Sequence, residues 1–227
     1  MPSTTYLPMG HYKAILWDLD GTLMDTGPGI FAAFRHVQKL KGWPEIDDKT
    51  LHTLVGPPLV QSYMKTFGIS ETEGIEASHL HRAYQKKYSY QLSLSYPGMA
   101  ELLMQLKDRG YLLAVSTLKG EVIARKTLEA GQLDQFFDTI CGVTPNHITA
   151  KKSDIMQRAL DHLSLTTRDA LLVGDSRFDA FGAWKKMMPF VAVTYGYGFH
   201  SAADADPWHP LHISDSVDDL NTFLSTL

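Results

Sequence analysis

Three short segments of this chain place carboxylates or hydroxyls directly after apolar runs. Residues 18–23 follow the apolar run 14–17, residues 116–117 follow 112–115, and residues 174–179 follow 171–173. The strands of a buried parallel sheet are apolar throughout, and ligands bind beyond their carboxyl ends. We therefore expect two carboxylate clusters and a hydroxyl pair in one crevice. Such a set suits a metal-assisted phosphoryl transfer with an aspartate nucleophile.

The first carboxylate pair consists of Asp18 and Asp20, which lie on either side of Leu19, so on a strand their side chains share a face. Gly21 lets the chain turn sharply as it leaves that strand. Two carboxylates so close repel each other unless a cation or a shared proton relieves them. Mg²⁺ is a natural partner, because it prefers oxygen ligands and is commonly shared with a substrate phosphate. On residue types alone, a turn or a helix cap explains the pair equally well.

The second carboxylate pair is formed by Asp175 and Asp179, which follow Gly174 at the start of an expected helix. Negative charge is favoured near a helix N-terminus, so capping is an alternative role, above all for Asp179. Asp175 stands directly at the strand end and is the better metal ligand of the two.

Hydroxyl and ammonium groups complete the candidate set. Ser116 and Thr117 lie between a strand and a helix, where hydroxyls and amide N–H groups suit a phosphate. Lys151 and Lys152 precede a later helix, and a lysine at that place is able to neutralise phosphate charge. Helix capping and solvation are the ordinary alternatives for these four residues.

Length and composition bound the class of protein. The 227 residues, 44% of them hydrophobic, suffice for one large domain or a domain with a smaller insertion. A net charge of −4 argues against nucleic-acid binding, and a single cysteine, Cys141, excludes an internal disulfide. No apolar run is long enough to span a membrane, and residues 1–10 lack the pattern of a signal peptide. We therefore expect a cytoplasmic protein without membrane or nucleic-acid partners.

Apolar runs alternate with amphipathic segments along most of the chain. This alternation predicts an α/β protein with a doubly wound, Rossmann-like parallel sheet. The expected strands cover residues 13–18, 112–115, 139–143, 170–173 and 190–193.

An all-helical insertion interrupts that alternation. Residues 47–94 contain no convincing strand, and apolar positions at helical spacing predict helices, the last from residue 72 to about 94. We therefore expect a core domain built from residues 1–25 and 97–227, with a helical cap domain over residues 26–96.

The quoted motifs resemble those of a known superfamily. Residues 16–26, Leu-Trp-Asp-Leu-Asp-Gly-Thr-Leu-Met-Asp-Thr, resemble the first signature of the haloacid dehalogenase superfamily. Ser116 falls on its second signature, and residues 174–176 with Asp179 fall on its fourth. The likeness covers nearly the whole chain from Lys13.

The likeness is narrower for the phosphoglycolate phosphatase-like branch, whose helical cap follows the first signature. Gly56-Pro57-Pro58-Leu59 is similar to a cap segment of that branch, and Tyr195-Gly196-Tyr197-Gly198 is similar to a loop in some of its phosphatases.

The resemblance implies a Mg²⁺-dependent phosphatase. Asp18 would attack phosphorus and form an aspartyl phosphate, and Asp20 would protonate the leaving alcohol and then deprotonate the hydrolytic water. The carboxylates of Asp18 and Asp175 and the backbone carbonyl of Asp20 would hold Mg²⁺, with Asp179 as a further candidate ligand.

The resemblance also assigns the groups that would bind the phosphoryl oxygens. Ser116 would bind them with help from backbone amides near Leu19 and Thr117, and a lysine would stabilise the transferring group. The third signature usually holds a Lys-Pro pair, whereas this chain has Lys151-Lys152-Ser153. Counting back from the apolar positions of the next helix, Lys152 fits better than Lys151.

Two other activities use a similar set of groups. A sugar phosphomutase employs the same aspartate pair, but it needs a cap built to retain a phosphorylated sugar. A non-hydrolytic phosphoacceptor domain uses an aspartate, Mg²⁺, a hydroxyl and a lysine, but it is shorter and lacks a helical insertion. A dehalogenase does not need an acid/base group at the position of Asp20, whose presence favours phosphoryl transfer.

The motifs do not determine the substrate, because the cap that closes over such a site supplies selectivity. Candidate contacts are Arg35, Gly56 with the two prolines after it, and Arg82, each of which also suits a solvated or packing role. The expected partner is a small phosphorylated metabolite, such as phosphoglycolate, a nucleotide, a sugar phosphate or pyrophosphate. The sequence leaves the oligomeric state undetermined.

Overall fold

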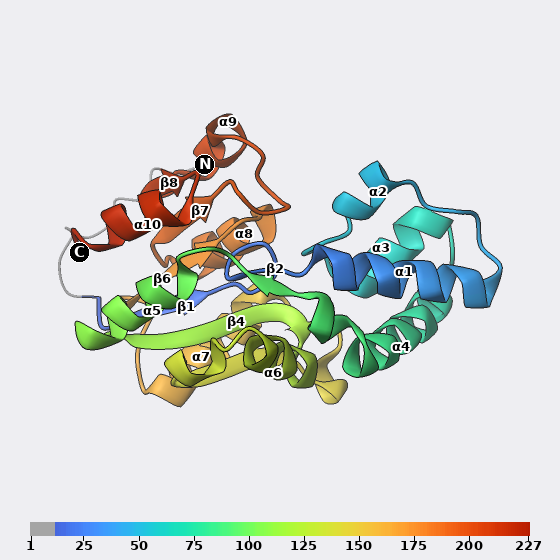
Figure 1. Cartoon of the computed structure of the whole chain (residues 1–227), viewed down its shortest axis with the longest axis horizontal. Helices are drawn as coiled ribbons and strands as arrows, with labels where there is room; N and C mark the ends of the chain where they lie inside the picture. The colour runs from blue at the N-terminus through green and yellow to red at the C-terminus, as the bar shows by residue number, and fades with distance from the viewer. Residues whose placement is uncertain (1–11) are drawn as a thin grey trace.

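The computed structural model describes residues 12–227, so residues 1–10 and the expectation about them lie outside it (Figure 1). Its core is a sheet in the order β5-β4-β1-β6-β7-β8, in which every neighbouring pair is parallel. The strands are β1 (Ala14–Trp17), β4 (Leu112–Gly120), β5 (Thr139–Val143), β6 (Ala170–Gly174), β7 (Phe190–Val193) and β8 (His212–Ser214). The order runs outward from β1 in both directions, as a doubly wound sheet requires.

Helices cover both faces of this sheet. They are α5 (Met99–Asp108), α6 (Glu121–Ala130), α7 (Lys152–Leu163), α8 (Arg177–Lys186) and α10 (Val217–Leu224). Ile15 and Trp17 of β1 pack into one apolar cluster with α5, α6 and α10, whereas Ala14 and Leu16 pack into a second cluster with α7 and α8. Each large apolar side chain so buried contributes roughly 1.5–3 kcal/mol. The predicted doubly wound α/β fold is confirmed.

A helical insertion projects to one side of the sheet (Figure 1). It comprises α1 (Gly27–Lys41), α2 (Asp48–His52), α3 (Leu59–Phe67), α4 (Glu71–Lys87) and the short 3₁₀ helix η1 (Ser89–Leu92). The insertion begins after β2 (Met24–Asp25) and ends at β3 (Leu94–Ser95), and these two strands pair antiparallel. Its helices enclose their own apolar cluster around Phe34, Leu51 and Tyr63. The inserted all-helical cap expected from the sequence is therefore present.

Local signals set the ends of these helices. Ser70 and Glu73 form a capping box at the start of α4, in which each side chain accepts the backbone N–H of the other residue. Gly68 ends α3 with a φ of 64°, a left-handed conformation that glycine adopts without strain.

The structure differs from the sequence prediction at several element boundaries. α4 ends at Lys87, well before residue 94, because the next residues tighten into η1. β4 continues to Gly120 rather than ending at residue 115, since pairing with β5 carries the strand into a polar stretch that apolar periodicity does not mark. The strands β2, β3 and β8 have three residues or fewer, too few to show a periodic pattern.

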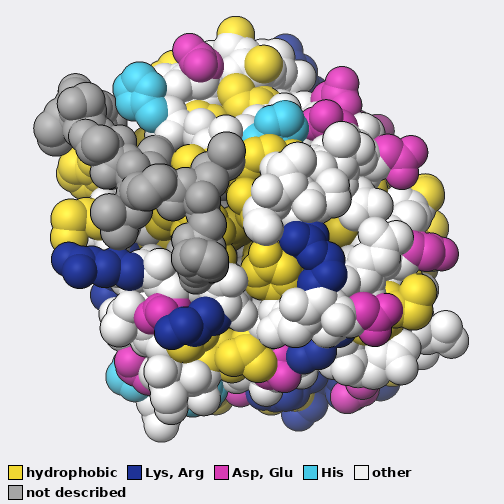
Figure 2. Space-filling model, turned by 90° about the vertical axis from the view of Figure 1, so that its left-hand side faces the viewer, with side chains coloured by type: hydrophobic (Ala, Val, Ile, Leu, Met, Phe, Trp, Pro, Cys, Tyr) yellow, Lys and Arg dark blue, Asp and Glu magenta, His cyan; other side chains and the backbone are white. Residues whose placement is uncertain are grey.

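Among residues 12–227, no helix is both long and apolar enough to cross a bilayer. Basic and acidic side chains are interspersed over the face that Figure 2 shows.

Candidate active site

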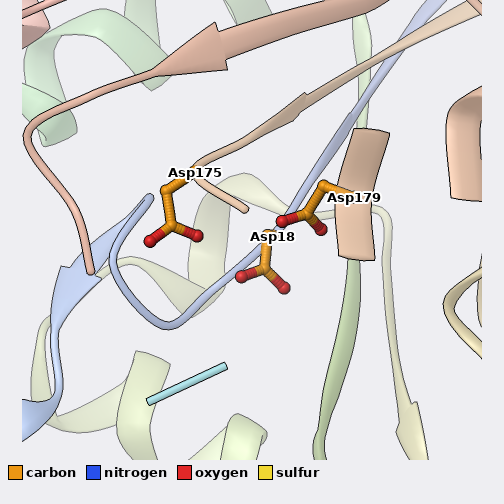
Figure 3. A group of neighbouring side chains, drawn as sticks. All are labelled: Asp18, Asp175 and Asp179. Atoms are coloured by element: carbon orange, nitrogen blue, oxygen red, sulfur yellow. The ribbon is translucent and has the colours of Figure 1, made fainter. Parts of the chain in front are cut away.

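The predicted carboxylates meet at the carboxyl edge of the sheet (Figure 3). Asp18 follows β1, Asp175 follows β6, and Asp179 lies in the first turn of α8. Trp17 is opposite Val173 in the pairing of β1 with β6, so Asp18 and Asp175 leave the sheet on adjacent strands. All three carboxylates are buried, and one oxygen atom of each lies within 4.8 Å of the others.

Lys152, the first residue of α7, is the cation of this cluster. Its Nζ lies 2.5 Å from Asp18 Oδ1 and 2.6 Å from Asp179 Oδ1, and its side chain is 4% exposed. Lys151 is exposed, and its backbone N–H donates to the Asp154 carboxylate at the start of α7. The fold thus brings Lys152, and not Lys151, to the carboxylates.

Burial makes ionisation of this cluster costly. It raises the pKa of Asp18 to about 7, although the charge of Lys152 opposes that rise. Burial, together with the charges of Asp179 and Asp18, holds the pKa of Asp175 well above its ordinary value of 3.8. Burial also works against the charge of Lys152, but attraction to Asp179 and Asp18 outweighs it and raises the pKa of that lysine. Three clustered carboxylates, two of which contact one ammonium group, are a set that a bound cation would relieve.

Asp18 and Asp175 fit a hard divalent cation such as Mg²⁺, because both offer carboxylate oxygens from adjacent strands. Asp175 is held in place by the loop after β7, whose Tyr197 and Gly198 donate their backbone N–H groups to its Oδ2 at 2.7 and 3.0 Å. Hydrogen bonds to one oxygen of a carboxylate fix the direction of its other oxygen, which is then oriented toward a metal. The metal site expected from the sequence is therefore chemically consistent with the residues present.

Asp179 has less freedom to bind a metal directly. Its Oδ2 accepts hydrogen bonds from the backbone N–H and the hydroxyl of Ser176, at 3.1 and 2.5 Å, and its Oδ1 faces Lys152. The carboxylate thus caps α8 and positions the lysine. Asp179 nevertheless belongs, with Asp18 and Asp175, to the group of carboxylates that are close enough together to hold a metal ion.

Asp20 points toward a different group of partners. Its Oδ1 accepts a hydrogen bond from Thr26 Oγ1 at 2.6 Å and lies 2.7 Å from Lys119 Nζ. Its carboxylate is not part of the group of possible metal ligands, so a metal contact from Asp20 would come from its backbone carbonyl. Lys119, 5% exposed on its side chain, was not expected from the sequence because the predicted strand stopped at Val115.

The hydroxyl pair lies at the polar end of β4. Ser116 Oγ is buried and has no hydrogen-bond partner among residues 12–227, an arrangement that costs free energy unless a ligand completes it. Thr117 lines the same pocket as the carboxylates, and its Oγ1 accepts the backbone N–H of Lys119. The side chain of Leu19 is buried in the core, and its carbonyl accepts N–H groups of the turn that follows.

The helical insertion brings Gly56 to the site but not Arg35. Gly56, with a φ of +94°, lies between α2 and α3 and lines the reaction pocket together with Asp18 and Lys152. Arg35 is half exposed on α1, forms an ion pair with Asp48, and lines none of the pockets at the site. Its expected role as a substrate contact is therefore not supported, because its face of α1 points to solvent.

Comparison with known proteins identifies the family. Residues 15–193 match the family model described as haloacid dehalogenase-like hydrolase. The chain belongs to this family. The superfamily resemblance of its first, second and fourth signatures is thereby confirmed.

Haloacid dehalogenase-like relatives cover most of the chain. A 5'-nucleotidase from Pseudomonas aeruginosa is 32% identical over 201 residues, which are 88% of this chain and 90% of that protein. A phosphoglycolate phosphatase from Nitrosospira multiformis is 32% identical over 194 residues, 82% of this chain and 84% of that protein. The crystal structure of a predicted phosphatase from Clostridium acetobutylicum superposes with a TM-score of 0.90 at 32% identity, covering 96% of this chain and 100% of that one. The chain is thus a phosphatase of this family that acts on phosphate esters.

One relative is named for a different activity, so the fold alone does not determine the reaction. The tyrosine-protein kinase PtkA of Mycobacterium tuberculosis is 31% identical over 186 residues. The match covers 82% of this chain and 63% of PtkA, so this chain spans less than two thirds of that relative. The substrate of a haloacid dehalogenase-like protein must therefore be argued from its site.

Proposed function

We propose that this protein is a Mg²⁺-dependent phosphatase that hydrolyses a small phosphomonoester through an aspartyl phosphate on Asp18. The observation that carries the proposal is the contact of Asp18 with Lys152 in a buried pocket, beside Asp175 on the neighbouring strand. Asp20, two residues further on, lines the same pocket and is available as an acid and base.

The reaction divides between the two aspartates of the first segment. A carboxylate oxygen of Asp18 bonds to phosphorus as the bond from phosphorus to the leaving alkoxide breaks, and Asp20 gives that alkoxide its proton. Asp20 then takes a proton from water, which attacks phosphorus, releases phosphate and restores Asp18. Ser116 and the backbone amides near it would hold the phosphoryl oxygens, and Lys152 would neutralise their charge.

Mg²⁺ would be held by Asp18 and Asp175 with the backbone carbonyl of Asp20, and when bound it would neutralise phosphate charge.

We assign residues 26–96 to the cap and residues 1–25 and 97–227 to the core, because β2 and β3 pair where the chain crosses between them. The proposed partner is a small phosphorylated metabolite, and the proposed location is the cytoplasm, whose reducing conditions fit a chain with a single, buried cysteine.

Phosphate release from a panel of phosphorylated metabolites, with and without Mg²⁺, tests this function. We expect Mg²⁺-dependent release that falls at least about 10³-fold in Asp18→Asn, because the nucleophile is lost. Lys152→Met should lose on the order of 10²-fold or more, whereas the matched control Lys151→Met should stay within about twofold of wild type.

Acid-quenched single turnovers test the covalent intermediate. Mass spectrometry should find a phosphoryl adduct on the peptide that contains Asp18. Full activity of Asp18→Asn, or no phosphate release by folded wild type from any ester of the panel, would refute the proposed phosphatase function. Transfer of phosphate to a second position of a sugar, without release, would assign the protein to the phosphomutases instead.

A further inference from the structure

We propose that His81, Gln85 and Lys119 form a subsite for a second anionic group on the substrate's leaving group. The protein would then prefer small phosphate esters that also carry a carboxylate or a second phosphate. This inference rests on the proposed phosphatase function and names its substrate class.

The subsite is a cavity that adjoins the reaction pocket on the side of Asp20. The walls of the two spaces share Asp20, Gly56 and Leu118. Because Asp20 is the group that would give a proton to the leaving alcohol, the leaving group lies next to it. The neighbouring cavity is therefore the space into which the rest of that leaving group extends.

His81 offers this cavity a neutral hydrogen-bond donor. The residue is fully buried on α4, with its Nδ1 2.9 Å from the hydroxyl of Tyr63, and its Nε2 has no partner among residues 12–227. Burial raises the pKa of Tyr63, so its hydroxyl keeps its proton, and Nδ1 is the acceptor in reach of that proton. The resulting tautomer carries its hydrogen on Nε2.

The charge around His81 favours an anion. Lys119 lines the cavity and has Asp20 as its carboxylate partner. Arg82, the next residue on α4, has a buried Nε without a partner, and no carboxylate of the described chain forms an ion pair with it. Of these two cations, only Lys119 has a carboxylate partner among residues 12–227. Since buried charges and donors without partners are costly, an anionic ligand would stabilise this arrangement.

Gln85 and Gly120 complete the geometry of the subsite. Gln85 lies one turn after His81 on α4, is 4% exposed and lines the same cavity. Gly120 lines both this cavity and the groove that contains Arg82, so the guanidinium lies just behind the cavity wall. Donors therefore approach the cavity from the cap and from β4 together.

Size separates small acids from larger leaving groups. The cavity has a volume of about 30 Å³, and Ile30, Leu54 and Leu59 form its apolar wall. A space of that size holds roughly one or two water-sized groups, which suits a carboxylate but not a sugar ring or a nucleobase. The chemistry and the size together favour a small leaving group with an acidic end.

The test compares kcat/KM for small substrates whose leaving groups differ in charge. Phosphoglycolate carries a carboxylate, 2-hydroxyethyl phosphate carries a hydroxyl at the same place, and pyrophosphate carries a second phosphate. We expect wild type to prefer phosphoglycolate, pyrophosphate or both over 2-hydroxyethyl phosphate by about tenfold or more. Comparison of kcat/KM for the two acidic substrates distinguishes a subsite for carboxylate from a subsite for phosphate.

Variants on α4 assign the preference to named residues. His81→Phe keeps an aromatic ring and removes the Nε2 donor, so it should reduce the preference for acidic substrates about tenfold. Arg82→Gln should reduce the preference as well. Lys87→Gln removes a positive charge from the exposed side of the same helix and should leave the preference unchanged.

Competition in wild type gives a readout that does not depend on the folding of a variant. Glycolate should inhibit competitively at concentrations at which ethylene glycol does not. Equal kcat/KM for acidic and neutral esters, or equal effects of glycolate and ethylene glycol, would overturn the subsite while leaving the phosphatase function intact. Failure to release phosphate from any ester would instead overturn the proposed function.

Discussion

Buried polar groups that lack a hydrogen-bond partner or a counter-ion lie near the carboxyl ends of β1, β4 and β6. Ser116 Oγ and His81 Nε2 have no partner within residues 12–227, and Asp18 and Asp175 are carboxylates whose pKa values burial raises. An unsatisfied buried polar group costs roughly 1–3 kcal/mol. A bound cation and an anionic substrate would supply the missing partners of these groups. The atoms that lower the stability of the free protein would then be the atoms that bind its ligands.

His81 should make stability pH-dependent. Burial, with the nearby charges of Lys119 and Arg82, holds its pKa well below 6.5, and Tyr63 and Phe34 face its ring without adding charge. Above pH 6.5 the histidine is neutral in both states. Below it the unfolded chain binds a proton that the folded protein resists, so the free energy of unfolding falls by about 1.4 kcal/mol per pH unit until the folded-state pKa is reached.

Urea unfolding at pH 6.5 and pH 5.5 checks this expectation. Wild type should lose about 1 kcal/mol more than His81→Phe over that interval, because the other acidic groups are common to both proteins. Equal losses in the two proteins would mean that His81 is not held neutral in the folded state.

At the scale of elements, the loop of residues 195–198 joins the proposed metal site to the crossings between core and cap. Its backbone donates to Asp175, and the hydroxyl of Tyr197 donates to Asp25 at the first crossing. The ring of Tyr195 packs against Tyr96 at the second crossing, with centroids 4.9 Å apart. The loop therefore links the orientation of a proposed metal ligand to the place where the cap is attached.

Gly196→Ala should disturb this loop specifically. A Cβ at Gly196 would lie 2.2 Å from the carbonyl oxygen of Gly21 and 2.4 Å from Asp175 Oδ2, and a backbone oxygen cannot move aside cheaply. We expect the Mg²⁺ concentration for half-maximal activity to rise about tenfold or more, as for other changes to groups that orient a metal ligand.

Gly110→Ala is the control for this variant, because Gly110 has a φ of +87° and nothing within 4 Å of an added Cβ. It should lower stability by about 1 kcal/mol and leave the Mg²⁺ dependence unchanged. Wild-type Mg²⁺ dependence in Gly196→Ala would show that the loop does not orient Asp175.

The elements also show what the sequence can reveal. Asp18, Ser116 and Asp175 could be found because each follows an apolar run, and parallel strands bring their carboxyl ends to one edge. The contacts of Lys119 with Asp20 and of Tyr197 with Asp25 could not be found, because these partners lie 99 and 172 residues apart along the chain. Such contacts follow from strand pairing and loop packing, which leave no local periodic signal.

At the scale of the whole molecule, the chain crosses between core and cap at one place. Asp25 and Leu94 are paired partners in the β2–β3 ribbon, so the chain leaves and re-enters the core side by side. The buried cluster of the cap, around Phe34 and Tyr63, has no buried member in common with the two clusters of the core. The core should therefore keep its own packing when the cap is removed.

Replacing residues 26–93 by Asn-Gly tests this division, because two residues close a tight hairpin between paired strands. The shortened protein should unfold cooperatively in urea and still be stabilised by Mg²⁺, since Asp18, Asp175 and Lys152 remain. Its kcat/KM for phosphoglycolate should fall about 100-fold or more, and its preference over 2-hydroxyethyl phosphate should disappear, because His81 and Gln85 are lost and water enters the pocket. A shortened protein without a cooperative transition would show that the core depends on the cap, and a retained preference would place the anion subsite on the core alone.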